Sequence, residues 1–147
     1  MPIAHDYIRA TLERFEGKGV AEGYVPAKNG VALGVSGVTV GTGVDLGQQT
    51  GIGLMDMGVP HSVVKKLLPY MGLKKAAAQE ALRRQRLTLS PAEVDALDDA
   101  VIRHYVRAIE ARYNKNFPAS PFADIPREAQ AVVVSILYQR GLGSCAK

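Results

Sequence analysis

The chain has 147 residues, of which 47% are apolar and 22% are charged. These fractions match soluble globular proteins and exclude intrinsic disorder, and the length is sufficient for one domain with a hydrophobic core. The net charge of +4 favours an anionic partner such as cell-wall polymer, membrane surface or nucleic acid, although such a charge also serves solubility alone.

The first part of the chain is rich in glycine and short apolar alternations. Apolar residues at i, i+4 and i+7 predict a helix over 3–15, which Gly17 ends. Residues 31–35 and 38–42 alternate with the period of strands, and Ser36-Gly37 between them resembles a turn. We therefore expect a small β-hairpin or a three-stranded sheet here.

The rest of the chain has helical character. A helical stretch is expected from Pro60, and a second over 73–87, which is rich in Ala, Lys and Arg. Ser90-Pro91-Ala92-Glu93 is a strong helix start, and the helix that follows is expected to end near Asn114. A last helix is expected from Pro126. Its buried residues would be Ala129, Val132, Val133, Ile136 and Leu137.

Glycine is unevenly distributed, since eleven of the fifteen glycines lie between Gly17 and Gly53. This predicts a single α+β, mostly α domain over 1–147. It would consist of a glycine-rich β lobe at about 17–53 packed on a helical lobe at about 60–147.

Glu16 is a candidate acid because it ends the first helix, at the junction of the two parts. A carboxyl group in a partly apolar setting suits proton donation, whereas an exposed carboxylate at a helix end is the plain alternative.

The stretch 37–47, GVTVGTGVDLG, is a second candidate for chemistry. Gly41 and Gly43 leave room for a ligand or a backbone, and Thr39 and Asp45 are polar points among valines. Glycines that only bend a hairpin are the structural alternative. A phosphate cradle is disfavoured, because the glycines do not have its spacing.

Glu16-Gly17 followed by the stretch 37–47 resembles the pesticin branch of the phage-type lysozymes, muramidase domains of bacteriocins and secreted toxins. In that branch a Glu at the end of the first helix precedes a Thr and an Asp on the following sheet. Thr39 follows Glu16 by 23 residues and Asp45 follows Thr39 by 6, which agrees with the branch. In other phage lysozymes the second carboxylate comes before the Thr, so Glu22 is the rival of Asp45.

The resemblance implies a lysozyme-like fold and cleavage of peptidoglycan between N-acetylmuramic acid and N-acetylglucosamine. It implies that Glu16 is the general acid and that Asp45 and Thr39 complete the site. A hydroxyl both donates and accepts, so Thr39 is suited to hold a water for Asp45 to activate. We therefore expect carboxyl groups about 6.5–9.5 Å apart and inversion of configuration.

Further residues are expected to contact the substrate. Gly41 and Gly43 belong to a Thr-x-Gly-x-Gly turn typical of these lysozymes, and Tyr138 and Gln139 match a helix on the far wall of their cleft. No cofactor or metal is expected, because His5, His61 and His104 are too far apart in the sequence to form a ligand pair.

The C-terminal part departs from the family pattern. Relatives usually continue well beyond Tyr138-Gln139, so the helical lobe is expected to be truncated and its last helix to expose apolar surface. This leaves an alternative, a catalytically silent relative that binds wall polymer or a partner protein. The resemblance also admits an immunity or inhibitor protein, and a partner chain that completes the lobe. Nucleic acid is not expected, since no binding motif accompanies the charge.

Cysteine content and targeting signals bear on location. The single cysteine, Cys145, allows no internal disulfide. No apolar run is long enough for a membrane-spanning helix, and the N-terminus lacks the regions of a Sec signal. We expect synthesis in the cytoplasm and, after delivery by another route, action on the cell wall in the periplasm or outside the cell.

Overall fold

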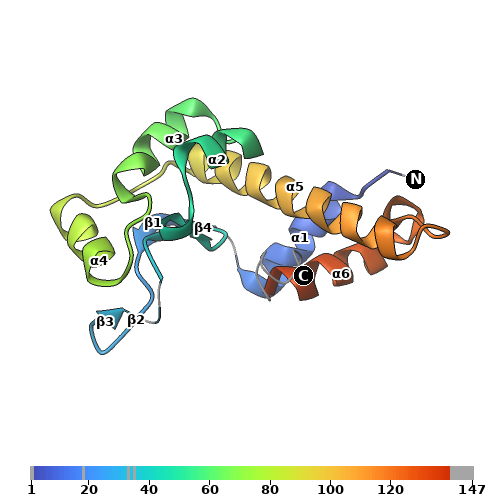
Figure 1. Cartoon of the computed structure of the whole chain (residues 1–147), viewed down its shortest axis with the longest axis horizontal. Helices are drawn as coiled ribbons and strands as arrows, with labels where there is room; N and C mark the ends of the chain where they lie inside the picture. Colours follow the sequence, from blue (N-terminus) through green and yellow to red (C-terminus); the bar gives the residue numbers. More distant parts are fainter. Residues whose placement is uncertain (1, 18, 33, 35, 140–147) are drawn as a thin grey trace. The chain divides into compact units, whose positions relative to one another are not determined.

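The computed structural model describes residues 2–17, 19–32, 34 and 36–139 (Figure 1). The predicted features at Leu33, Val35, 140–141 and Cys145 lie outside the described residues, as do the side chains of Glu16 and Gln139. The chain divides into two compact units. We call Met1–Gly17 with Ile102–Lys147 the terminal unit and Lys18–Val101 the central unit.

The described chain is mostly helical with a small antiparallel sheet, which confirms the predicted fold class. The long helix α5 (Pro91–Asn116) contributes its first part to the central unit and its second part to the terminal unit. Among the described helices, none combines the length and the apolar character needed to cross a membrane.

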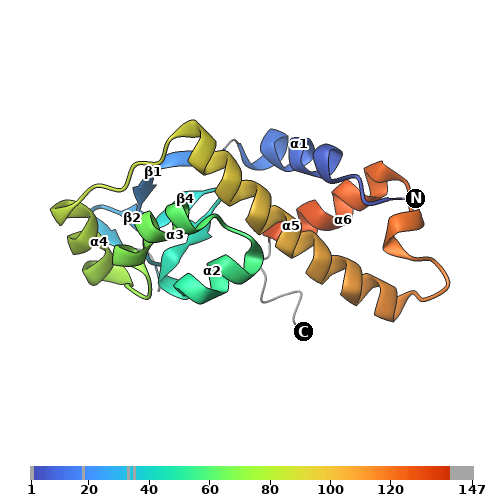
Figure 2. The same cartoon turned by 90° about the horizontal axis from the view of Figure 1, so that it is seen from above.

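The terminal unit packs the two ends of the chain together. It contains α1 (His5–Glu16), the second part of α5, the 3₁₀ helix η3 (Phe122–Asp124) and α6 (Arg127–Gln139). Helices α1 and α6 lie side by side (Figures 1 and 2). The core between them and α5 consists of Ile8, Leu12, Ile102, Val106, Ile109, Phe122, Ala131 and Val134.

The buried face of α6 differs from the predicted one. Val132 and Ile136, expected to be buried, are 55% and 49% exposed. Gln130, Ala131 and Val134 are buried instead. Positions two residues apart are rotated by about 200° around a helix, so a helix that buries 130 and 134 turns 132 and 136 outward. The prediction of the buried face was therefore wrong at these two positions.

The hydrogen bonds of Gln130 explain which face of α6 is buried. Its side chain is 2% exposed, accepts from the backbone N–H of Ala4 (3.0 Å) and donates to the carbonyls of Phe122 (3.2 Å) and Ile125 (3.1 Å). A buried amide is stable only when its groups are paired. Gln130 therefore ties the start of α1 to the turn that precedes α6.

The central unit consists of two small sheets and short helices (Figure 2). The strands are β1 (Val20–Tyr24), β2 (Ala27–Lys28), β3 (Val31–Ala32), β4 (Thr39–Gly41) and β5 (Val44–Asp45). The helices before α5 are η1 (Leu46–Gln48), α2 (Gly51–Met57), α3 (His61–Leu67), η2 (Leu68–Tyr70) and α4 (Lys75–Arg84). Large buried side chains at its core include Val38, Val40, Leu46, Leu54, Leu67, Tyr70 and Leu97.

The strand pairing corrects the predicted hairpin. The three-stranded sheet has the order β1-β4-β5, and β2 pairs with β3. Ser36-Gly37 is therefore not the turn between two paired strands. The two-residue turn lies at Asn29-Gly30, where both φ angles are positive, as a type I′ hairpin requires. A second turn at Thr42-Gly43 joins β4 to β5.

The predicted helix start at Ser90 is confirmed. The Ser90 hydroxyl accepts from the Glu93 N–H (3.2 Å), and the Glu93 carboxylate accepts from the Ser90 N–H (2.9 Å). This is a capping box, which satisfies two backbone donors at the start of α5.

Candidate active site

Thr39 and Asp45 are brought together by the β4–β5 hairpin. The two residues are directly paired across the antiparallel strands. Side chains of a directly opposed pair lie on the same face of a sheet, with Cβ atoms about 4.5–5.5 Å apart. Two of the three predicted catalytic residues are thus neighbours through local strand pairing.

The carboxylate of Asp45 is held by three donors. Its Oδ1 accepts from the backbone N–H groups of Gly37 (3.0 Å) and Gly47 (2.9 Å), and its Oδ2 accepts from the side-chain amide of Gln48 (3.2 Å). Every partner is a donor, which suits an ionised carboxylate because that group only accepts. Oδ1 is occupied by two backbone donors, whereas Oδ2 has a single exposed amide and retains capacity to accept.

Gly37 and Gly47 are needed for this arrangement. A Cβ at Gly37 would lie 2.3 Å from the carbonyl oxygen of Leu73 and 2.7 Å from the Cα of Gly47. A Cβ at Gly47 would lie 2.7 Å from the same oxygen. The two donors of Asp45 and the backbone of Leu73 therefore form one tightly packed layer, which only glycine permits.

The Thr39 side chain is buried, with 6% of the residue exposed. Its hydroxyl donates to the carbonyl of Gly37 (3.3 Å). The hydrogen of the hydroxyl is thus used, and its oxygen can still accept.

Gly41 lies against the buried side chain of Asp98. Gly41 has φ 63°, and a Cβ there would lie 2.5 Å from Oδ1 of Asp98. Asp98, on α5, is 4% exposed and accepts from the N–H of Thr42 (2.7 Å). The room at Gly41 therefore admits a buried carboxylate that holds the hairpin turn. Sequence reasoning did not single out Asp98, although an acid within the apolar stripe between Val94 and Val101 was a signal.

Gly43 differs from Gly41. Its φ of 96° explains the glycine at the turn, but a Cβ there would meet nothing within 4 Å. The space beside Gly43 is open, so the predicted approach of a ligand has room at this position.

Tyr24 is a further candidate for the site, which the sequence analysis did not single out. It pairs directly with Thr39 across β1 and β4, so Tyr24, Thr39 and Asp45 form a row on one face of the sheet. Tyr24 is 44% exposed, which leaves part of its ring available to a ligand. The rival carboxylate Glu22, also on β1, forms an ion pair with Arg86 (3.0 Å).

The other predicted site residues belong to the terminal unit. Glu16 is the last residue of α1, followed by Gly17 at φ 84°. Tyr138 is partly buried against the core and packs edge-on against Tyr105, with ring centroids 5.2 Å apart. Gln139 is the last residue of α6. Substrate contact by Tyr138 and Gln139 stays a prediction.

Acidic residues and histidines form no metal cluster in the part of the chain that the structure describes. The chemistry available at the hairpin is that of one oriented carboxylate and one hydroxyl beside an exposed tyrosine.

Comparison with known proteins identifies the family to which the chain belongs. No curated protein matches the chain significantly. A family model named Pesticin, described as the C-terminal part of a bacterial toxin homologue of phage lysozyme, matches residues 3–147. This match includes the positions of Glu16, Thr39 and Asp45. The chain therefore belongs to the Pesticin family of bacterial toxin homologues of phage lysozyme.

Proposed function

We propose that this chain is a muramidase that hydrolyses the bond between N-acetylmuramic acid and N-acetylglucosamine in peptidoglycan. The observation that carries the proposal is the cross-strand pair of Thr39 and Asp45, whose carboxylate is oriented by three donors. Membership of a family homologous to phage lysozyme supports the same chemistry.

Asp45 is assigned the role of base through its Oδ2 atom. Oδ1 is engaged by the N–H groups of Gly37 and Gly47, which fix the plane of the carboxylate. A water between Oδ2 and the hydroxyl of Thr39 would donate one hydrogen to each. Its lone pair would then be directed toward the anomeric carbon, and Asp45 would take the proton as the water attacks.

Glu16 is assigned the role of general acid, which protonates the leaving oxygen on the opposite face of the sugar. This assignment rests on its place at the end of α1 and on the family pattern. With a water between base and sugar, the reaction inverts configuration.

Tyr24 is assigned the role of a sugar platform, because it is the exposed aromatic residue in the row with Thr39 and Asp45. The open side of Gly43 is assigned to the approach of the glycan. Tyr138 and Gln139 are assigned to the opposite side of the substrate, as the family resemblance implies.

The activity is that of an antibacterial toxin or lysin. The chain would act on the cell wall in the periplasm or outside the cell. An immunity protein would protect the producing cell.

The test is clearing of purified peptidoglycan by the full chain, with the masses and anomers of the products recorded early in the reaction. We expect products with reducing N-acetylmuramic acid ends and inverted configuration. Glu16→Gln and Asp45→Asn should each lower the rate at least about 100-fold, the scale of general acid–base catalysis. Thr39→Val, which keeps the branched shape and loses the hydroxyl, should lower it less.

Folding must be checked for each variant by circular dichroism and thermal melting. A folded Glu16→Gln variant that clears peptidoglycan at the normal rate would remove the assignment. Retained configuration would remove the water-activation role of Asp45. If the unsubstituted chain binds peptidoglycan and cleaves none, the chain is the silent wall-binding relative instead.

A further inference from the structure

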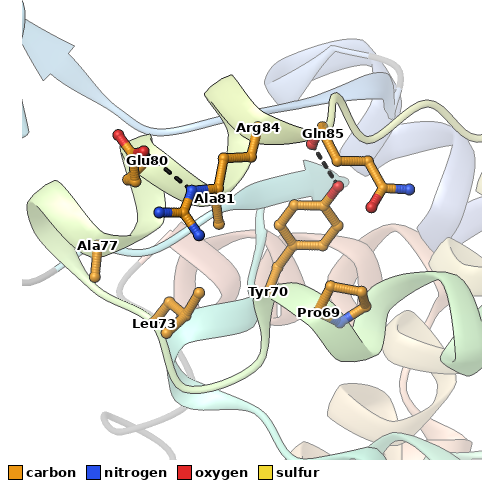
Figure 3. A pocket seen from close by; sticks show the side chains of 8 residues that line it. All are labelled: Pro69, Tyr70, Leu73, Ala77, Glu80, Ala81, Arg84 and Gln85. Atoms are coloured by element: carbon orange, nitrogen blue, oxygen red, sulfur yellow. Dashed lines mark hydrogen bonds and ion pairs between the residues drawn. The ribbon is translucent and has the colours of Figure 1, made fainter.

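We propose that the pocket beneath α4 binds the acidic stem peptide of peptidoglycan, next to the catalytic hairpin. The inference rests on the proposed function for its substrate and adds a second contact, to the peptide rather than to the glycan. The pocket has a volume of about 430 Å³ and belongs entirely to the central unit (Figure 3). It is lined by Pro69, Tyr70, Leu73, Ala77, Glu80, Ala81, Arg84 and Gln85.

The pocket combines aliphatic walls with a charged rim, which Glu80 and Arg84 form. Pro69, Leu73, Ala77 and Ala81 supply aliphatic surface, which suits the methyl groups of alanine side chains. The aromatic ring of Tyr70 is buried, with 2% of the residue exposed, and its hydroxyl donates to the carbonyl of Gln85 (2.6 Å). The pocket therefore lacks an exposed ring on which a sugar would stack, and its surface favours a peptide.

The rim of the pocket carries a net positive charge. Residues 74–86 contain five basic residues and one acidic residue, Glu80. Glu80 is shared by Arg83 and by Arg84, whose Nε lies 3.1 Å from the carboxylate. Two guanidinium groups against one carboxylate leave a surplus of one positive charge. An anionic ligand is favoured at this rim.

Arg84 is the group positioned to receive a carboxylate. Its Nε donates to the Glu80 carboxylate, and a guanidinium has five N–H donors in all. Figure 3 shows its terminal nitrogens extending toward the side of the pocket formed by Ala77 and Leu73. A carboxylate between the aliphatic walls would accept from these nitrogens while the pair with Glu80 stays in place.

The pocket is physically joined to the loop that holds Asp45. The carbonyl of Leu73, a pocket residue, packs against Gly37 and Gly47, the two backbone donors of Asp45. The N–H of Lys75, at the start of α4, donates to the carbonyl of Ser36 (2.9 Å). Lys75 has φ 54°, a conformation that a lysine adopts only when its surroundings demand it. Pocket and catalytic hairpin are thus one packed layer apart.

This proximity fits the geometry of the substrate. Stem peptides branch from the muramic acid residues of the glycan and carry free carboxylates. Three or four extended residues span roughly 10–14 Å. A glycan bound at Asp45 can therefore place the acidic part of its own stem peptide in the pocket beneath α4.

The test compares two arginines that share a partner. Arg83 and Arg84 are similarly exposed (78% and 80%) and both pair with Glu80, but only Arg84 lines the pocket. Cleavage is measured on intact peptidoglycan and on glycan strands from which an amidase has removed the stems. Arg84→Ala should raise KM about 1.5- to 5-fold on intact peptidoglycan, the range for one exposed charged contact. It should leave KM on stripped glycan unchanged, and Arg83→Ala should change neither.

Ala77→Leu fills the pocket without changing its charge and should reproduce the effect of Arg84→Ala. Equal losses for the Arg83 and Arg84 variants would overturn the proposal, since they would indicate general charge attraction. Unchanged KM in the Arg84 and Ala77 variants, each verified as folded, would also overturn it.

A binding measurement separates this proposal from the catalytic one. The full isotopically labelled chain is titrated with a synthetic stem tetrapeptide, and amide shifts are followed by NMR. Shifts confined to the pocket residues 69–85 support the peptide site, even if no cleavage is seen. Absent shifts, or shifts elsewhere, overturn it and leave the muramidase proposal to its own test.

Discussion

Asp98 is a buried carboxylate that lies against the turn of the β4–β5 hairpin. It accepts from the N–H of Thr42 at 2.7 Å and fits against Gly41, at the turn between Thr39 and Asp45. A buried carboxylate is costly unless its hydrogen bonds are made, so the position of the turn depends on it. We regard Asp98 as a positioning residue for the hairpin.

Asp98→Ala should therefore destabilise the chain by about 1–3 kcal/mol, the cost of removing one partner of a buried hydrogen bond. Asp98→Asn keeps an acceptor and should cost less. Urea unfolding measures both. Positioning also predicts a fall in kcat for Asp98→Ala that Asp98→Asn partly rescues. Equal losses of kcat in the two variants would indicate that the charge, and not the geometry, is what the hairpin needs.

The start of α5 shows how an element is stabilised by its first turn. Glu93 accepts from Lys66 on α3 (2.8 Å) and from the N–H of Ser90 (2.9 Å). The hydrogen bond from Lys66, and then that from the Ser90 backbone, lower the pKa of Glu93 below its ordinary value.

A carboxyl group with a lowered pKa in the folded chain stabilises the fold above its unfolded pKa of about 4.3. That stability is lost as the pH falls through the folded pKa. Glu93→Gln should accordingly lower the thermal midpoint at pH 7, and the difference from the unsubstituted chain should shrink as the pH falls below about 4. Thermal melts followed by circular dichroism across this range provide the measurement. A difference that is constant with pH would contradict the assigned role of the charge.

The sheet is the element whose pairing was hardest to predict. The alternation in 31–35 and 38–42 indicated strands, but it did not say which strands pair. Short strands of two to five residues carry too few side chains to specify a register. The contacts that specify it come from segments distant in sequence, such as the bonds of Gly23 and Leu89 that join β1 to residues 87–89.

At the scale of the whole molecule, the terminal unit is built from both ends of the chain. Ile8 and Leu12 of α1 share a core with residues 90 or more positions later. Its stability therefore depends on side chains such as Ile8, which is 0% exposed, and not on the outward face of α6, where Ile136 is 49% exposed.

The two isoleucines form a matched pair. Ile8→Ala should cost about 2–5 kcal/mol, as expected for a large buried side chain, while Ile136→Ala should cost about 0.5 kcal/mol or less. Chemical unfolding of the two variants, followed by circular dichroism, measures the difference. Similar costs would mean that the surface at Ile136 is covered in solution by a further contact, which a concentration series would reveal.

The sequence alone determined the features that depend on local chemistry. The Ser90-Pro91-Ala92-Glu93 start of α5 and the helical period of α1 follow from capping and side-chain spacing within a few residues. The candidate residues Glu16, Thr39 and Asp45 were identified from their spacing through resemblance to a family, and their catalytic roles stay a prediction.

Only the tertiary structure decided the features that depend on distant partners. The exposure of Val132 follows from Gln130, which is drawn inward by backbone groups near Ala4 and Phe122. The inclusion of Tyr24 in the row with Thr39 depends on strand pairing, and the room at Gly41 is filled by Asp98 from a helix over 50 residues later. Burial and register are set by packing free energy summed over many contacts, which no short stretch of sequence contains.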